Sequence, residues 1–349
     1  MAKNIVVYSD GTGQDGGVRP EQRVSNVYKL YRASRVSPET AIDPREQVAF
    51  YDPGLGTDIG ATALTSPVRF VQKLLASVVG SGITTNIADC YEFIINHYQP
   101  GDRIFLIGFS RGAYTVRCVA NLLMLCGVPT RTPSGPLMRF RKAVREVAKQ
   151  AVNDVLEHGA GHPRAEFEAE REELAKRFRN KYGSDGDGAA GESNVAPYFI
   201  GVFDTVAALG AHGLRRLLIH IGLGAAVAIA SALVLVLPAA AIAGLLYLIL
   251  GMHFWWTILA VMAASMIATN VWWWRRQKAA TLKTIRDFPK LGEVHSHYAE
   301  WKGNNFDRLL SRHVHYARSA NAIDETRKDF DRVAWGGVQT GVPDKVGGN

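Results

Sequence analysis

A long uncharged stretch constrains this chain more than any other feature of its sequence. From Leu217 to Trp274, 58 consecutive residues include no Asp, Glu, Lys or Arg. Over all 349 residues, hydrophobic residues make up 47% and charged residues 21%, close to the averages of globular proteins. A fibrous or disordered chain is therefore excluded. A purely soluble protein is disfavoured, because the rest of the chain could hardly bury so much apolar surface.

The uncharged stretch is long enough for two membrane crossings, since one crossing takes about 20 helical residues. We expect an inserted two-span transmembrane helical hairpin over 214–278, with spans near Leu217–Leu237 and Phe254–Trp274. Tryptophans near both ends of the second span are typical of interfacial anchors. Basic residues flank the hairpin and favour a multi-pass location in the inner membrane with both ends in the cytoplasm: Arg215, Arg216, Arg275, Arg276 and Lys278.

Charge and cysteine content exclude several classes of partner. The formal net charge is +8, but outside the membrane flanks there is no basic stripe interleaved with aromatic residues, so no nucleic-acid partner is expected. The three cysteines are irregularly spaced and form no CxxC pair, which predicts reduced thiols. Neither a metal nor a cofactor is expected, and the first strand-like run is too short for a signal peptide.

Short runs rich in β-branched residues alternate with segments of helical period. The runs lie at 4–8, 47–51, 103–107 and 197–203, and helices are expected at 86–97, with Asn86 as N-cap, and at 113–126. This alternation predicts an α/β fold with a mostly parallel sheet and helices on both faces. We assign its first part to 1–213 and its C-terminal part, which need not be complete, to 279–349.

Within the first part, residues 138–182 are strongly charged. We read them as an insertion of two solvated helices separated by a break at 159–163, which either cover a site or decorate the surface. Residues 184–193 contain two Asp-Gly pairs and are expected to form a flexible loop. The spacing of these pairs lacks the later glutamate of a calcium-binding loop.

The sharpest motif is Gly108-Phe109-Ser110-Arg111-Gly112, between a predicted strand and a predicted helix. A nucleophile elbow holds its serine in a strained turn and needs small residues two positions before and after it. Glycines 108 and 112 meet that need. We therefore predict Ser110 as a nucleophile and the backbone N–H of Arg111 as an oxyanion donor; the alternative is an ordinary strand-to-helix turn.

A second glycine-rich turn, residues 9–13, follows the first predicted strand. Gly11 or Thr12 is a candidate for the second oxyanion donor, and a plain turn is the alternative. An aspartyl phosphatase would need Asp where Tyr8 stands. The glycines at 54–60 have the wrong spacing for a dinucleotide site.

Asp204 follows the predicted strand at 197–203. Catalytic groups of α/β enzymes gather at the carboxyl ends of strands, and in hydrolases with this type of elbow the acid comes after the serine and before the histidine. Asp204 is thus the predicted acid that orients a histidine, with a helix N-cap as the alternative reading.

Together these residues resemble the bacterial α/β-hydrolase domain family that includes type VI secretion phospholipase effectors. The resemblance covers most of the chain except the charged helices and the apolar hairpin. It rests on motifs that occur in family order: residues 8–13, 25–31, 51–57, 101–114, 201–206 and 322–335.

The resemblance implies a Ser-Asp-His esterase that acts on phospholipids. Family members commonly carry a histidine where this chain has Ser319, and a later His-Ser-Asp-x-Gly-Gly segment that this chain does not contain. We take His315 as the base, with His313, His295 and His297 as substitutes. A second protein chain that supplies the missing histidine segment is the other hypothesis.

The expected function is therefore a membrane-anchored serine hydrolase. It would cleave acyl esters of membrane phospholipids, as a regulated toxin or phage-defence effector. The alternative is a catalytically inactive hydrolase-fold scaffold or sensor subunit completed by a partner chain. A soluble esterase whose apolar hairpin binds a partner is a third reading.

Overall fold

The computed structural model describes residues 2–11, 14, 16, 24–54, 81–186, 192–206, 221–222, 224–225, 228–229, 238, 240–249, 251, 253–300 and 314–322. They belong to two compact units. One holds the described residues up to 206 and those from 283 onward. The other holds the described residues from 221 to 282.

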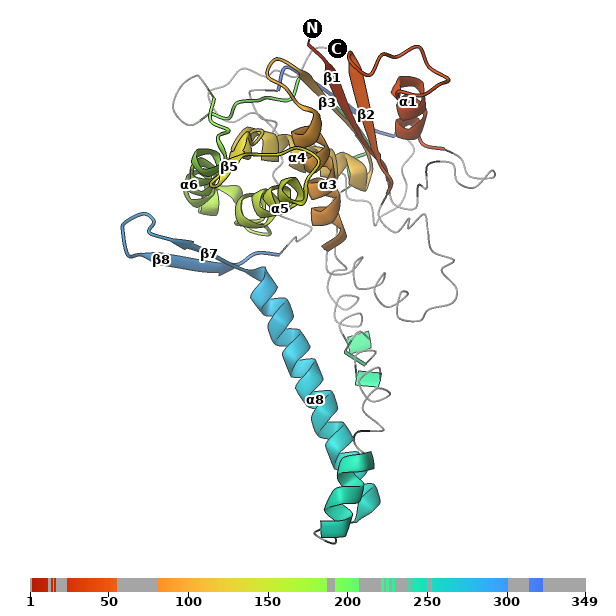
Figure 1. The fold of residues 1–349 in the computed structure, drawn as a ribbon, viewed down its shortest axis with the longest axis vertical. Helices are drawn as coiled ribbons and strands as arrows, with labels where there is room; N and C mark the ends of the chain where they lie inside the picture. Colours follow the sequence, from red (N-terminus) through yellow and green to blue (C-terminus); the bar gives the residue numbers. More distant parts are fainter. Residues whose placement is uncertain are drawn as a thin grey trace. The chain divides into compact units, whose positions relative to one another are not determined.

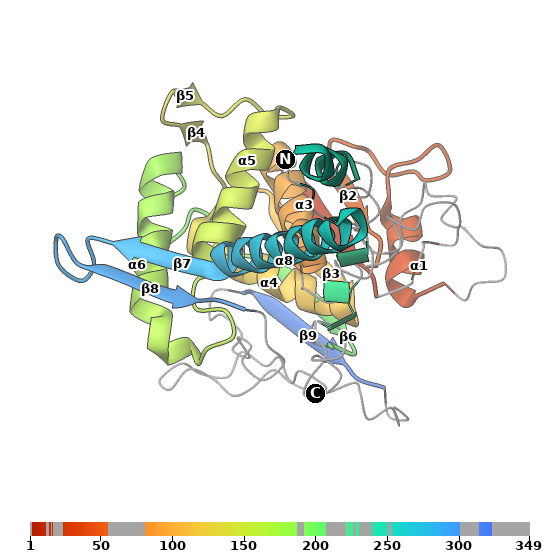
Figure 2. The same cartoon turned by 90° about the horizontal axis from the view of Figure 1, so that it is seen from below.

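The first unit is built on a five-stranded parallel sheet in the order β2-β1-β3-β6-β9. Strands β1, β2 and β3 are labelled in Figure 1, and β6 and β9 in Figure 2. Its strands are β1 (Asn4–Ser9), β2 (Gln47–Asp52), β3 (Arg103–Phe109), β6 (Phe199–Phe203) and β9 (Tyr316–Ala320). The four predicted strands and the α/β class are confirmed. The fifth strand, β9, was not predicted.

Helices cover both faces of the sheet, as predicted. Alternate residues of β1 explain why: Ile5 and Val7 are buried in one apolar cluster, whereas Val6 and Tyr8 are buried in another. Helix α1 (Asn26–Ser34) covers the second cluster through Val27, while α3 (Ser81–His97) and α4 (Arg111–Cys126) cover the first. The sheet lies between α1 and this pair in Figures 1 and 2.

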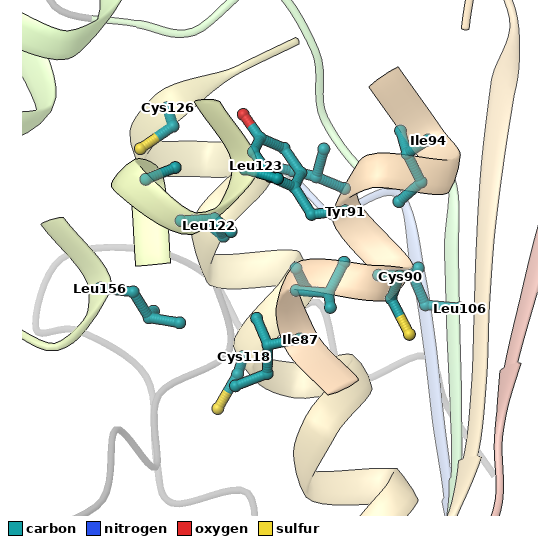
Figure 3. Close-up of a cluster of buried hydrophobic side chains, with 14 of the residues drawn as sticks. Ile87, Cys90, Tyr91, Ile94, Leu106, Cys118, Leu122, Leu123, Cys126 and Leu156 are labelled. Carbon is teal, nitrogen blue, oxygen red and sulfur yellow. The ribbon is translucent and has the colours of Figure 1, made fainter. Parts of the chain in front are cut away.

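The larger cluster forms the core of this unit. Ile87, Tyr91 and Ile94 of α3 lie against Leu122 and Leu123 of α4, and all five are at most 1% exposed (Figure 3). The cysteines are free and buried, as expected: Cys90, Cys118 and Cys126. Helix α3 already includes Asn86, so this residue is not the N-cap that we predicted. Its side chain instead donates to Asp52.

The charged insertion forms two helical segments, as predicted. They are α5 (Lys142–Gln150), extended by the π-helical turn η1 (Ala151–Leu156), and α6 (Arg164–Tyr182). The predicted break at 159–163 separates them. The insertion is not merely solvated, because Val144, Ala148, Val152 and Phe178 are buried in the core. Short strands β4 (Arg131–Thr132) and β5 (Gly135–Pro136) precede it. Residues 187–191 of the predicted loop lie outside the described residues.

Two strands that we did not predict, β7 (Leu282–Arg286) and β8 (Val294–Tyr298), form a two-stranded hairpin. Several polar contacts join it to the charged insertion. Lys283 Nζ lies 2.6 Å from Glu157 Oε2, and Arg177 donates to the carbonyls of Arg286 and Asp287 at 2.8 and 3.1 Å.

The second unit contains the apolar helix α8 (Phe254–Thr281), which includes the predicted second span and continues seven residues beyond it. Among the described residues, α8 alone is long and apolar enough to cross a membrane. A shorter apolar helix covers Ala240–Ile249. The first predicted span, Leu217–Leu237, lies largely outside the described residues. The structure therefore does not support the two-span hairpin, because it offers one candidate helix instead of two.

Side-chain exposure distinguishes α8 from a core helix. Only 6% of its most apolar 18-residue window is buried, whereas the core helix of a soluble protein is mostly buried. Trp255 and Trp256 near its start are 75% and 73% exposed, and Trp272 and Trp274 near its end are 57% and 54% exposed. The tryptophans thus lie exposed near both ends of α8.

Candidate active site

Ser110 occupies the sharp turn between β3 and α4. Its backbone has φ 56° and ψ −121°, a conformation that L residues rarely adopt and that costs about 1–3 kcal/mol. Two backbone hydrogen bonds hold it against the end of β6 and the loop that follows: Ser110 N–H donates to Phe203 O at 2.9 Å, and Val206 N–H donates to Ser110 O at 3.3 Å. The turn thus has the strained geometry predicted for a nucleophile elbow.

The glycines on either side of Ser110 are required by close backbone approach. A Cβ added to Gly108 would lie 2.5 Å from Gly112 O, and one added to Gly112 would lie 2.1 Å from Ser9 O. Neither distance is compatible with a side chain. The reason for two glycines in this motif is therefore steric, as predicted: α4 passes close to the ends of β1 and β3.

Asp204 follows β6, the neighbour of β3 in the sheet, so it lies at the same edge of the sheet as Ser110. Its backbone N–H donates to Ala320 O at 2.9 Å, and its Oδ1 accepts a hydrogen bond from the N–H of Ala322. The segment that follows β9 thereby fixes one oxygen of the carboxylate. A serine and a carboxylate at adjacent strand ends are compatible with the predicted Ser-Asp-His arrangement.

Of the three residues predicted as oxyanion donors, two lie next to Ser110 and one is outside the described residues. Arg111 is the first residue of α4, so its backbone N–H lies at the start of the helix, directly after Ser110. Gly11 packs against the elbow, because a Cβ there would lie 3.1 Å from Ser110 Cβ. Its N–H, however, donates to Asp10 Oδ1 at 2.8 Å and is therefore engaged. Thr12 lies outside the described residues.

The structure does not bring His315 to Ser110. His315 immediately precedes β9, at the amino end of a parallel strand, whereas Ser110 and Asp204 follow the carboxyl ends of theirs. The five residues of β9 span about 16 Å, which is the distance between the amino-end and carboxyl-end sides of the sheet at this strand. His315 is exposed, and its N–H donates to Pro197 O. Its predicted role as base therefore does not fit the topology of the sheet.

The substitute histidines do not complete the pair either. His295 and His297 are in β8, where they contact the charged insertion: His295 Nδ1 lies 3.0 Å from Glu170 Oε1, and His297 Nε2 accepts from Gly159 N–H at 2.9 Å. His313 lies outside the described residues.

Two buried carboxylates beside the elbow were not predicted as functional residues. Asp10 follows β1 and Asp52 is the last residue of β2; they are 2% and 5% exposed. Asp10 Oδ2 accepts hydrogen bonds from Ser25 and Tyr51, and Asp52 Oδ2 accepts from Ser9 Oγ at 2.6 Å. Burial raises the pKa of Asp10, and it raises the pKa of Asp52 to about 7. These carboxylates connect the ends of β1 and β2 to the loop that packs on Ser110.

The raised pKa of Asp52 predicts a pH-dependent stability. The folded state binds this proton more tightly than the unfolded chain does, so the stability that it contributes is present below about pH 4 and is lost as the pH rises through about 7. Asp52→Asn should therefore match the wild type at pH 4 and exceed it at pH 8 by on the order of 3–4 kcal/mol, at about 1.4 kcal/mol per pKa unit. Melting temperatures of the full chain across this range measure the effect. A difference that does not change with pH would contradict it, and the exposed Asp154→Asn is the matched control.

The parallel sheet, the helices on both faces and the serine turn define an α/β protein with a hydrolase-type strand-turn-helix motif. Residues 3–228 match the sequence model of the family described as "T6SS, Phospholipase effector Tle1-like, catalytic domain". The match covers more than half of the chain. The protein belongs to this family, which confirms the predicted relation to type VI secretion phospholipase effectors.

The individual proteins that match this chain have low sequence identity to it. The uncharacterized protein YEL023C of Saccharomyces cerevisiae is 27% identical over 215 residues, which cover 60% of this chain and 27% of that protein. An uncharacterized protein from Pseudomonas aeruginosa is 18% identical with a TM-score of 0.26, over 59% of this chain and 30% of that one. The Tle1 effector bound to the VgrG spike is 17% identical with a TM-score of 0.20, over 59% and 38%. The chain thus spans well under half of each relative.

Proposed function

We propose that this protein is a membrane-anchored serine phospholipase that cleaves acyl esters of membrane phospholipids. The observation that carries the proposal is the strained turn at Ser110, with Asp204 at the adjacent strand end, in a chain that belongs to a phospholipase effector family. Strain of this kind in a non-glycine residue concentrates at functional sites.

The proposed chemistry follows from the placement of these groups. Ser110 Oγ attacks the ester carbonyl while an imidazole takes its proton, and the N–H of Arg111 stabilises the oxyanion that forms. The same imidazole then protonates the departing glycerol oxygen, which leaves an acyl-serine. Water hydrolyses that ester and releases a fatty acid. Asp204 holds the imidazole in the tautomer that can accept the proton.

The imidazole is proposed to come from outside the described residues. Asp204 contacts the segment that follows β9, because the N–H of Ala322 donates to its carboxylate. If the purified chain is active alone, the histidine belongs to this chain. If activity appears only on addition of a second polypeptide, a partner supplies it, as in our hypothesis of a completing chain.

Membrane attachment is proposed to occur through α8 together with the first predicted span as a hairpin, because β6 before the apolar stretch and β9 after it pair in one sheet and must lie on the same side of the membrane. The exposed apolar surface of α8, its terminal tryptophans and the basic residues that follow support an inner-membrane location with the hydrolase unit in the cytoplasm. An enzyme tethered there meets phospholipid at high effective concentration. Since such activity would damage the host membrane, we propose a restrained toxin or phage-defence effector.

The substrate is tested with phospholipid vesicles. The full chain, reconstituted in its membrane or in detergent, should release fatty acid and lysophospholipid from phosphatidylethanolamine and phosphatidylglycerol vesicles. Release of a phosphorylated head group without fatty acid would contradict acyl-ester cleavage, because it would mean that a phosphodiester bond is broken.

A second candidate function is a catalytically inactive scaffold or sensor subunit. The placement of His315 at the opposite edge of the sheet favours it, because Ser110 without a base is a poor nucleophile near neutral pH. In that case neither fatty acid nor lysophospholipid is released with any partner, while lipid still binds to the chain.

A further inference from the structure

Histidines gather where the charged insertion meets the β7–β8 hairpin. His158 follows η1 and is 1% exposed, Glu170 lies on α6, and His297 lies on β8. The ring centroids of His158 and His297 are 4.5 Å apart, and His158 Nε2 lies 2.6 Å from Glu170 Oε2. This histidine cluster brings together residues that are up to 139 positions apart in the sequence.

We propose that His158, Glu170 and His297 form a zinc-binding site. One ligand atom from each residue lies within 4.8 Å of those from the other two. In a tetrahedral site with bonds of about 2.0–2.1 Å, ligand atoms are about 3.4 Å apart, so modest side-chain movements complete the geometry. Two histidines and one glutamate are a donor set that zinc accepts, with water in the fourth position.

A buried ring nitrogen that lacks a hydrogen-bond partner in the described part of the chain supports the zinc site. His297 Nδ1 is buried and has no hydrogen-bond partner among the described residues. A buried polar atom left without a partner costs about 1–3 kcal/mol, so such atoms call for an explanation.

The protons can be accounted for at each ligand. Gly159 N–H donates to His297 Nε2, so without a metal the ring carries its proton on Nδ1. Zinc at Nδ1 moves that proton to Nε2, and the Gly159 N–H must then turn away. Gly159 has a φ of 75° in a turn, where glycine reorients at low cost. At His158, zinc replaces the proton between Nε2 and Glu170, and this proton passes to Nδ1 or to solvent.

Surrounding contacts hold the ligands in place. Glu170 Oε1 lies 3.0 Å from His295 Nδ1, and Arg171 donates from Nε and Nη2 to His158 O at 3.0 and 2.8 Å. Outer contacts of this kind orient metal ligands. The nearby positive charge of Lys283 is paired with Glu157. Bound zinc would fasten the hairpin that follows α8 in the chain to the charged insertion, which is a structural role separate from catalysis at Ser110.

Metal binding to the full chain tests the proposal. Protein stripped with a chelator and dialysed against micromolar ZnCl2 should retain about one zinc per chain by elemental analysis, and its melting temperature should rise. Glu170→Gln, which keeps the side-chain shape, and His297→Ala should each weaken zinc affinity at least tenfold and abolish the rise. His315→Ala is the matched control, because His315 is an exposed residue directly before β9 and is not one of the three proposed ligands. This variant should bind zinc as the wild type does.

Two results would overturn the site: no zinc retained by the wild type, or equal retention by the wild type and Glu170→Gln. The second variant matters because His297→Ala alone can fail by misfolding. The readouts are metal content and melting temperature, so they are independent of hydrolysis, and failure here leaves the proposed phospholipase activity untouched.

Discussion

Replacing Ser110 with alanine should abolish fatty-acid release from phospholipid vesicles, with kcat reduced by up to about 10⁶-fold. Alanine keeps the backbone of the turn and removes only the oxygen that attacks the ester. The hydrogen bonds that hold this residue to Phe203 and Val206 are made by the backbone and survive the change. Melting temperature and lipid binding should therefore stay close to those of the wild type.

The matched control for this variant is Ser296→Ala, which removes an exposed hydroxyl from β8 and should leave activity unchanged. A Ser110→Ala protein that retains a tenth or more of wild-type hydrolysis would place the nucleophile elsewhere. Loss of hydrolysis together with loss of the folded state would not decide the matter, so the melting curve is recorded on the same sample.

Replacing Gly112 with alanine should have the largest effect on folding. The added Cβ would lie 2.1 Å from Ser9 O and 2.6 Å from Asp10 O, and both are backbone atoms that cannot rotate away. α4 would have to move off the end of β1, which we expect to cost about 3 kcal/mol or more in unfolding free energy. Hydrolysis should fall as well, because the same movement displaces Ser110.

Gly222→Ala is the matched control, since a Cβ at Gly222 meets no atom within 4 Å. This helical position should tolerate alanine with no loss of stability. If Gly112→Ala melts within 2 °C of the wild type, the close approach of α4 to β1 is not a constraint on the elbow. Denaturation of both variants by urea gives the free energies directly.

The central strands could be predicted because burial leaves a strong local signal in them. β1 and β3 are runs of apolar, often β-branched residues, and alternate side chains of β1 face different cores. β9 gives no such signal: it lies at the sheet edge, and only Ala317 of its five residues is buried. The residues of β7 and β8 are mostly exposed as well, so their pairing depends on contacts with the insertion, which are distant in sequence.

The residues of the candidate site also differ in whether a buried strand beside them gives a signal in the sequence. Ser110 and Asp204 could be predicted because each follows a buried strand, and parallel strands bring such positions to one edge. The placement of His315 depends on the register of β9, an unpredicted strand, and the residue lies at its amino end. The carboxylates of Asp10 and Asp52 look like ordinary turn residues in the sequence. Only the fold brings Ser9, Ser25, Tyr51 and Asn86 around them.

The role of Ser110 as nucleophile is tested most directly by covalent labelling. The folded full chain is treated with a fluorophosphonate, which phosphonylates activated serines, and the modified peptide is identified by mass spectrometry. We expect one adduct, on the peptide that contains Ser110, and none after heat unfolding. An adduct on another serine, or phospholipid hydrolysis that persists with Ser110 unmodified, would contradict this role.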